Sequence, residues 1–357
     1  MKCRLTEFSP EDYSKLHARL ATQGLLPDSG AIFTSPGWLT AWIETIGAGQ
    51  QTASVVAEQD AEQVAYLPLV LRRRALREWA LIGQPSVYAD HWRPACDPVD
   101  ARDFLHSALD CLDRQSAGWG SLRFASISAD LAASIGEATN SPDKDRFSLI
   151  ESGVAPYLDL SAGFDSILAG FSKKKRYNLK RTVRLAEEGG LRYEAPAEPP
   201  DELLDTLLKL HRRRAADRKI RSTFDEDAIA GFHRTFLRTA DGRSHTWFRV
   251  LRHDDDIVAV FYGFRCNGAL SFYQQGFDPD IGHLSPGSVL LYRVIEEACS
   301  SQISEFDFLQ GDEAYKSQWT NSKRVLYEVT MFARSARGRT LRSIRHAREM
   351  AKKVLRR

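Results

Sequence analysis

Apolar positions in the first half of the chain follow two periods, and each period predicts its own kind of element. β-Branched and aromatic residues between turn signals predict a strand meander at 53–58, 63–72 and 78–82. A helical period follows at 100–114, and a strand at 121–126. Before the meander we expect a strand at 3–7, a helix that begins at Pro10 behind Ser9 as N-cap, and a helix after Ser35-Pro36-Gly37.

The second half repeats this kind of pattern. Helical periods at 202–216 and 225–239 precede three strong strand candidates at 245–252, 257–265 and 269–277, the last two joined by the hairpin signal Asn267-Gly268. A loop at 278–284, a helix from Ser285 to about residue 302, and strands at 305–309 and 325–332 complete the half. A meander followed by a helix and a further strand predicts an α/β fold with a mixed sheet.

Length and composition indicate a globular protein of two domains. The chain has 357 residues, 43% of them hydrophobic and 27% charged. We expect domains at 1–158 and 159–335, followed by a basic amphipathic helix at 336–357. No apolar run is long enough for a membrane helix or a signal core, so we expect a cytoplasmic protein. The five cysteines include no CxxC pair, which predicts free thiols and no metal.

A net charge of +2 conceals two strongly basic segments. Residues 171–184 contain no acid, and in 336–357 nine lysines and arginines face only Glu349. The first segment predicts a helix that contacts a phosphate-bearing partner, or else a solvated helix face. The second predicts a helix that lies on the inner face of an anionic membrane, or one that packs on its own domain.

Two segments of the second half could carry chemistry. The predicted helix at 285–302 begins with a serine cap, a proline and a glycine, so its free amides and helix dipole could bind phosphate; the alternative is a simple capped helix. Residues 306–319 follow a strand and are rich in polar side chains, where mixed sheets gather ligands. Taken singly, Asp307 could only satisfy backbone groups, and Trp319 could only belong to the core.

Five segments in this order resemble the CelD/BcsL-type GNAT acetyltransferases, which are relatives of the Fem-type peptidyltransferases. The resemblance covers roughly residues 160 to 332, and the first half is similar only in element order. It rests on 172–178 (SKKKRYN), 210–214 (LHRRR), 272–277 (FYQQGF), 285–287 (SPG) and 307–319 (DFLQGDEAYKSQW). It implies tandem GNAT-like domains with a Fem-like architecture.

The resemblance further implies an acyltransferase that uses acyl-CoA, with acetyl-CoA as the expected co-substrate, to modify an amine or hydroxyl of a sugar, polysaccharide or envelope precursor. The donor diphosphate would lie on the helix start formed by Leu284, Ser285, Pro286, Gly287 and Ser288. Candidate bases are His283, Asp312 and Asp307. Tyr273 and Tyr315 could protonate the leaving thiolate, and Lys316 would act electrostatically.

An anionic acceptor, such as a glycan, a nucleotide-sugar or a lipid-linked intermediate, would contact the basic segment and its surroundings. The candidate contacts are Lys175, Arg176, Asn178, His211, Gln274 and Trp319. Two other functions stay open. One is a Fem-like transferase that takes an aminoacyl group from tRNA, the only nucleic acid we expect as a partner. The other is a non-catalytic binding module on the GNAT scaffold.

Overall fold

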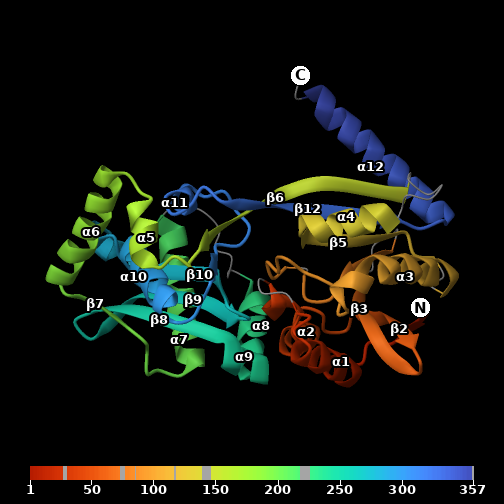
Figure 1. Cartoon of the computed structure of the whole chain (residues 1–357), viewed down its shortest axis with the longest axis horizontal. Coiled ribbons are helices and arrows are strands. Elements are labelled where there is room, and N and C mark those ends of the chain that lie inside the picture. The colour runs from red at the N-terminus through yellow and green to blue at the C-terminus, as the bar shows by residue number, and fades with distance from the viewer. Residues whose placement is uncertain are drawn as a thin grey trace. The chain divides into compact units, whose positions relative to one another are not determined.

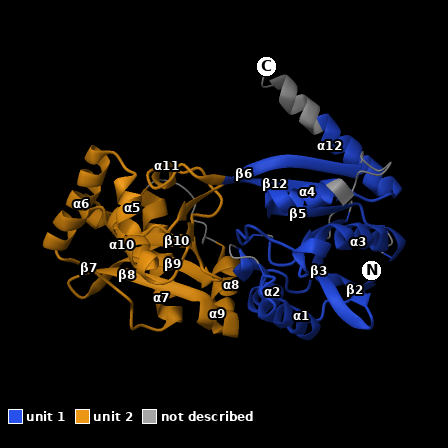
Figure 2. Cartoon of the chain, in the orientation of Figure 1, with its two compact units in different colours: residues 1–154, 324–357 blue, residues 155–323 orange. Residues whose placement is uncertain are grey.

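The structure is a computed structural model that describes residues 1–26, 30–72, 77–84, 86–115, 118–138, 146–217 and 226–355, with side chains of the last helix described up to residue 347. The chain divides into two compact units (Figures 1 and 2). Unit 1 comprises residues 1–154 and 324–357, and unit 2 comprises residues 155–323. The predicted domains at 1–158 and 159–335 therefore differ from these units at 155–158 and at 324–335.

Unit 1 is a sheet with helices packed against it. The order of its strands is β1-β2-β3-β4-β5-β12, followed by β6. Most neighbours are antiparallel, whereas β4 and β5 run parallel. The strands are β1 (Lys2–Thr6), β2 (Gln51–Gln59), β3 (Glu62–Arg72), β4 (Glu78–Leu81), β5 (Ser121–Ile127), β6 (Phe147–Asp159) and β12 (Lys323–Phe332).

All but one of the described helices of unit 1 agree with the local signals in the sequence. They are α1 (Pro10–Thr22), α2 (Pro36–Glu44), α3 (Ala101–Gln115), α4 (Ala129–Ala138) and α12 (Ala336–Leu355), with 3-10 turns η1 (Ala31–Thr34) and η2 (Pro98–Asp100). The predicted N-cap of α1 is confirmed, because the Ser9 hydroxyl accepts a hydrogen bond from the Asp12 amide at 3.2 Å. Helix α3 buries Phe104, Leu105 and Leu112 against the sheet.

Unit 2 has helices on both faces of its sheet. The strand order is β6-β11-β10-β9-β8-β7, in which β10 and β11 are parallel. The strands, after the end of β6, are β7 (Leu191–Glu194), β8 (Thr246–His253), β9 (Asp256–Cys266), β10 (Ala269–Phe277) and β11 (Glu305–Asp307). The predicted mixed α/β fold is confirmed in both units, since each contains parallel and antiparallel pairs.

The helices of unit 2 are α5 (Phe164–Ala169), α6 (Lys173–Glu188), α7 (Pro200–Asp217), α8 (Asp227–Arg238), α9 (Ala240–His245), α10 (Pro286–Ser300) and α11 (Ala314–Ser317), with the 3-10 turn η4 (Pro279–Leu284). On one face, α10 buries Leu290 and Ile295 in a core with Phe261, Phe272 and Phe306. On the other face, His233 of α8 meets the rings of Tyr262 and Tyr273.

Some elements differ from the sequence-based expectation. Strand β6, with 13 residues, and helix α4 were not predicted. The expected loop at 278–284 is the 3-10 turn η4, and β11 ends at Asp307 instead of residue 309. The predicted start of a helix at residue 225 lies outside the described residues. Among the residues that the structure describes, no helix is long and apolar enough to cross a bilayer.

Candidate active site

The sheet of unit 2 opens where β10 and β11 separate. The two parallel strands pair only over three residues each, from Ala269 opposite Glu305 to Ser271 opposite Asp307. Strand β10 continues for six further residues to Phe277 and stays paired with β9 on its other side. Because β11 has ended by then, the edge of β10 beyond Ser271 is left without β11 as a neighbour.

A β-bulge lies at the start of this unpaired edge. The register with β9 steps from Phe272 opposite Gly263 to Gln274 opposite Tyr262, so Tyr273 is the extra residue. Bulges of this kind re-aim side chains and are frequent next to active sites. Tyr273 is buried on the α8 face of the sheet, with its ring centroid 5.0 Å from that of His233.

Tyr273 and Tyr315, the two predicted proton donors, lie on opposite faces of the sheet. Phe272, next to Tyr273, points to the α10 face, and its ring centroid lies 6.2 Å from that of Tyr315. Burial raises the pKa of the Tyr315 phenol well above its usual value, so this half-buried group keeps its proton at neutral pH. The structure thus brings Tyr315, but not Tyr273, to the face on which α10 lies.

Asp307 and Lys316 are built into the turn that leads away from β11. The Asp307 carboxylate is fully buried and accepts a hydrogen bond from the Leu309 amide at 2.7 Å. The Lys316 ammonium donates to the carbonyl oxygens of Leu309, at 3.2 Å, and Gln310, at 3.1 Å, and pairs with Glu313 at 2.8 Å. In this structure both charged groups hold the loop, and a catalytic role for either stays a prediction.

The start of helix α10 differs from the predicted serine cap. Ser285 has φ 55° and ψ 46°, and its side chain accepts no capping hydrogen bond. The prediction of a side-chain cap was wrong. The left-handed conformation of Ser285 leaves its carbonyl oxygen, and not its hydroxyl, as the acceptor for amides of the first turn. The Ser288 and Val289 amides both donate to the Ser285 carbonyl oxygen, at 3.0 and 3.1 Å. Since Pro286 has no N–H group, only the Gly287 amide is left in this turn for a ligand.

Gly287 is a site of close packing within the protein. A Cβ atom at this position would lie 2.9 Å from Cε1 of Phe277, so the glycine lets α10 approach the end of β10. This packing is one reason for a glycine at position 287, and a contact between its backbone and a ligand stays a prediction. Leu284 and Ser285 are half-buried, and Ser288 is exposed at the surface.

Beside Gly287, one acceptor atom of a buried polar side chain has no hydrogen bond within the described residues. Gln275 is only 9% exposed, and its Nε2 lies 3.5 Å from the position that a Gly287 Cβ would take. Within the described residues, its Oε1 atom accepts no hydrogen bond. An orphaned buried acceptor is costly unless a ligand or water completes it. The sequence analysis named Gln274 and missed Gln275, although the strand period from Phe277 puts Gln275 on the same face.

The remaining candidate residues spread over several elements. His283, on η4, and Asp312, in the loop after β11, are exposed. His211 and Gln274 are half-buried; the backbone of His211 approaches β10 closely, with its amide nitrogen 3.0 Å from the position of a Cβ on Gly276. Trp319 belongs to the core, where its ring centroid lies 6.1 Å from that of Phe171.

The three predicted contact residues of the basic helix α6 differ in exposure: two are half-buried and one is exposed. The Lys175 ammonium lies 3.8 Å from the centroid of the Phe171 ring, and burial lowers the pKa of Lys175. Arg176 donates to the Leu168 carbonyl oxygen at 3.4 Å. Asn178 is exposed. The expected phosphate contacts Lys175 and Arg176 are therefore partly engaged with their own unit.

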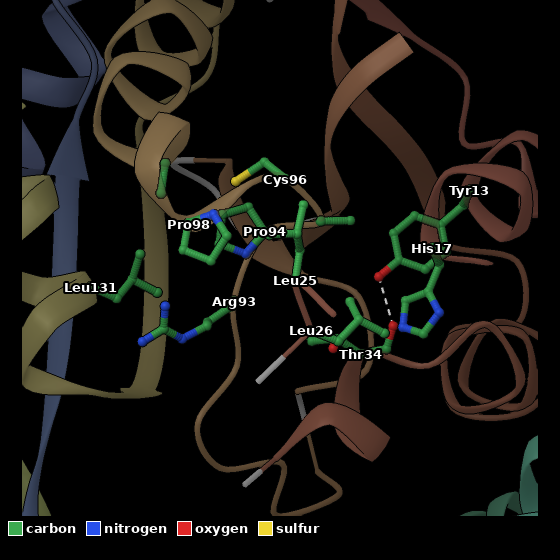
Figure 3. A pocket seen from close by; sticks show the side chains of 12 residues that line it. Tyr13, His17, Leu25, Leu26, Thr34, Arg93, Pro94, Cys96, Pro98 and Leu131 are labelled. Carbon is green, nitrogen blue, oxygen red and sulfur yellow. Dashed lines mark hydrogen bonds between the residues drawn. The ribbon is translucent and has the colours of Figure 1, made fainter. Parts of the chain in front are cut away.

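Unit 1 contains a narrow pocket of its own, and none of the predicted site residues lines it (Figure 3). On one side Tyr13 donates to the Thr34 carbonyl oxygen at 2.6 Å. On the other side lies Cys96, and burial raises the pKa of its thiol to about 12. At neutral pH this thiol is protonated, so the pocket offers no thiolate nucleophile. Among the described residues, no group of three or more His, Cys, Asp or Glu side chains could hold a metal.

Comparison with known proteins gives a family match for part of unit 2 and a fold for the chain. Residues 173–317 match the acetyltransferase (GNAT) domain family. No sequence among the curated proteins matches the chain. Solved structures nevertheless share its fold across nearly the whole length.

FemX has a TM-score of 0.67 at 9% identity, with 96% of this chain and 99% of that chain covered. L-PGS from Bacillus licheniformis has a TM-score of 0.58 at 14% identity, with 95% and 97% covered. A tandem GNAT protein from the clavulanic acid biosynthesis pathway has a TM-score of 0.51 at 12% identity, with 94% and 100% covered.

These identities show the fold alone, and the resemblance to the CelD/BcsL type in particular stays a prediction. The matched segment contains the bulge of β10, the start of α10 and the exit of β11. Residues 173–317 are therefore similar to a GNAT-type acetyltransferase domain, in a chain that has the fold of FemX and of tandem GNAT proteins.

Proposed function

We propose that this protein is an acyltransferase that moves an acyl group from coenzyme A to an amine or hydroxyl of a sugar, polysaccharide or envelope precursor. The observation that carries the proposal is the separation of β10 from β11 inside the GNAT-type domain. An unpaired strand edge offers backbone N–H and C=O groups to an extended ligand. The bulge at Tyr273 lies at the start of that edge.

Two features support the binding of an acyl donor along this strand edge. The Oε1 atom of Gln275 is buried without a partner and could accept a hydrogen bond from an amide of the donor. The segment from Leu284 to Ser288 would lie nearest the diphosphate of coenzyme A, and the Gly287 amide would donate a hydrogen bond to it. Coenzyme A would act as a co-substrate, and no metal takes part in the proposed reaction.

The proposed reaction is a direct transfer. The acceptor nitrogen or oxygen attacks the thioester carbonyl carbon, a new C–N or C–O bond forms, and the C–S bond breaks. The proton of the acceptor passes to a base, for which the exposed His283 and Asp312 are the candidates. The departing thiolate takes up a proton, for which Tyr315 is the candidate donor because its phenol is protonated at neutral pH.

One observation favours a second candidate, an aminoacyl group carried by tRNA. The first turn of α10 has few free N–H groups for a diphosphate, because Pro286 lacks an N–H group and the Ser288 and Val289 amides already donate to the Ser285 carbonyl oxygen. An aminoacyl ester needs no diphosphate at this position. The reacting carbonyl would still lie between β10 and β11, so the two candidates share the transfer site and differ in the donor.

Binding and turnover assays can distinguish the two candidate acyl donors. We would measure the melting temperature, and the release of free thiol, with acetyl-CoA and longer acyl-CoAs, and in parallel the deacylation of aminoacyl-tRNA. Stabilisation and thiol release with a thioester support the proposal. Deacylation of charged tRNA alone supports the second candidate. If neither donor binds, unit 2 is a binding module and the enzymatic proposal fails.

A pair of variants tests the proposed acid. Tyr315→Phe removes the phenol and should lower thiol release about a hundredfold, with a smaller change in the donor dissociation constant. Tyr327→Phe, at another half-buried tyrosine, is the matched control and should react like the native protein. Equal rates in Tyr315→Phe and the native protein would remove Tyr315 from the mechanism.

A further inference from the structure

Helix α6 turns one face into unit 2 and the other to solvent. Val183 and Ala186 are buried, and Leu179 is half-buried, in the core shared with α10. On the opposite side, Lys173, Tyr177, Arg181 and Leu185 follow one another at intervals of four residues and are all exposed. Residues at this interval lie on one face of a helix, about 5 to 6 Å apart. They form a row in which basic and apolar side chains alternate.

The apolar members of this row are unusual for unit 2. Tyr177 is 64% exposed and Leu185 is 40% exposed. In the described part of unit 2, no other large hydrophobic side chain reaches this exposure. Exposed apolar side chains that gather on one element, instead of being scattered, indicate a surface that meets a partner.

The charges around the row lack acidic partners. Lys174 and Lys180 flank it, and neither forms an ion pair with a described residue; the same holds for Lys173 and Arg181 within the row. Arg184 alone has an acid nearby, with its Nε 3.8 Å from Glu188. Some exposed cations elsewhere in unit 2 do have close acidic partners, as Arg234 has in Asp205 at 2.6 Å and Arg238 in Asp201 at 3.1 Å.

The position of the lysines adds to this imbalance. Lys173, Lys174 and Lys175 occupy the first turn of α6, which contains no acid. Cations at a helix N-terminus are repelled by the positive end of the helix dipole. The Ser172 side chain caps the turn by accepting from the Lys175 amide at 3.3 Å, but it brings no negative charge. An anionic partner outside the protein would relieve this repulsion.

We propose that this exposed side of α6, the α6 basic face, adsorbs unit 2 to an anionic lipid bilayer. The face consists of Lys173, Lys174, Tyr177, Lys180, Arg181 and Leu185, with Arg184 beside them. Its cations meet the lipid phosphates, and Tyr177 and Leu185 enter the boundary between headgroups and acyl chains. The proposal is independent of the proposed acyl transfer.

A bilayer fits this face better than a nucleic acid does. A phosphodiester chain would use the cations and could stack a base on Tyr177, but it offers nothing apolar to Leu185. Both apolar residues of the row have a place at the membrane interface. The other basic helix, α12, is partly engaged in unit 1: Arg345 donates to Thr330 at 2.6 Å and to Glu328 at 3.0 Å, and Arg337 donates to Gly118 at 2.9 Å. The predicted contact of α12 with a membrane is a separate proposal.

The test uses the full chain and vesicles of phosphatidylglycerol and phosphatidylcholine, with pure phosphatidylcholine vesicles as the uncharged reference. Cosedimentation would be measured for the native protein and for Lys173→Gln/Lys180→Gln/Arg181→Gln. Each lost charge should lower the partition coefficient about fivefold, so the triple variant should bind about a hundredfold more weakly. Tyr177→Ser/Leu185→Ser should lose the part of the binding that persists in high salt.

A charge-matched variant separates a specific face from net charge. Lys209→Gln/Arg265→Gln/Lys323→Gln removes three exposed cations from other elements of unit 2 and should bind like the native protein. Circular dichroism melting would establish that each variant is folded. Equal losses in the two triple variants, absence of native binding to anionic vesicles, or a preference for RNA over vesicles that depends on the same residues would each overturn the proposal.

Discussion

The side-chain ammonium of Lys316 donates a hydrogen bond to the main-chain carbonyl oxygen of Leu309, seven residues earlier, at 3.2 Å. Leu309 has φ 56°, a left-handed conformation that is uncommon for a residue other than glycine. The contact thus holds a strained backbone at the point where the chain leaves β11. Because this turn ends the pairing of β10 with β11, Lys316 helps to shape the candidate active site from outside it.

Replacing this lysine should loosen the turn. Lys316→Met keeps most of the buried volume but leaves the carbonyl oxygens of Leu309 and Gln310 without their donor. We expect unit 2 to lose about 2 kcal/mol of unfolding free energy. Urea unfolding followed by circular dichroism measures this. Lys323→Met, at an exposed lysine, is the control, and equal stability of the two variants would contradict the role given to Lys316.

A second charged group, the half-buried Glu297, ties α10 to the sheet. Glu297 accepts from Arg249 Nε at 2.7 Å and from the Tyr193 hydroxyl. Burial alone would raise the pKa of this carboxyl, but Arg249 and Tyr193 outweigh it and hold the pKa below the usual value. The ion pair therefore contributes stability above the unfolded-state pKa of about 4.3. That contribution is lost as the pH falls through the lower folded-state pKa.

Glu297→Gln should remove this acid dependence. We expect about 2 kcal/mol less unfolding free energy at pH 7, because Arg249 is left mostly buried without a carboxylate. The difference from the native protein should shrink as the pH approaches 3. Urea unfolding at pH 7, 5, 4 and 3 measures it. Glu296 precedes Glu297 and forms a more exposed ion pair with Arg293, so Glu296→Gln should change the unfolding free energy little. A loss of unfolding free energy in Glu297→Gln that stays constant with pH would refute the assignment.

Most of the fold follows from local patterns, and the exceptions have physical reasons. Strand β10 was predicted with its observed limits, because a hairpin turn precedes it and Asp278-Pro279 follows it. Strand β6 was missed because its pattern does not alternate. Leu149 and Ile150 in its first half are both exposed, and Gly153 and Pro156 interrupt the strand signal.

The candidate site was less accessible to sequence reasoning. Ser285-Pro286-Gly287 has the composition of a capped helix start, and the left-handed turn at Ser285 depends on how η4 enters it. Likewise, the sequence does not reveal that the Oε1 atom of Gln275 accepts no hydrogen bond within the described residues, since that depends on how β10 packs against α10. Local signals indicate elements, whereas the contacts between elements determine which polar atoms stay free.

The packing at Gly287 makes a prediction in the form of a double-mutant cycle. Gly287→Ala places a Cβ atom 2.9 Å from Cε1 of Phe277, so we expect a loss of about 1 to 3 kcal/mol of unfolding free energy. Phe277→Leu frees space and should recover part of that loss in the double variant. Thermal and urea unfolding of the four proteins measure the coupling. Additive effects of the two substitutions would show that the contact does not limit residue 287.

The last prediction concerns His233, which is fully buried and has its Nδ1 atom 3.2 Å from the Tyr262 hydroxyl. Burial lowers the pKa of this imidazole to about 3, so the native protein keeps it neutral. In the unfolded chain the imidazole takes up a proton near pH 6.5. Its contribution to stability is therefore complete above about pH 6.5 and declines as the pH falls toward 3, by up to about 1.4 kcal/mol per pH unit.

His233→Gln keeps a polar group beside Tyr262 but does not titrate. At pH 7 we expect the variant to be less stable, because the ring contacts with Tyr262 and Tyr273 are lost. As the pH falls from 7 to 5, the native protein should lose more unfolding free energy than the variant, so the two values converge. Urea unfolding at each pH tests this, with exposed His346→Gln as the control. Parallel pH profiles for native protein and His233→Gln would mean that the imidazole titrates alike in the folded and unfolded states, so that burial does not lower its pKa.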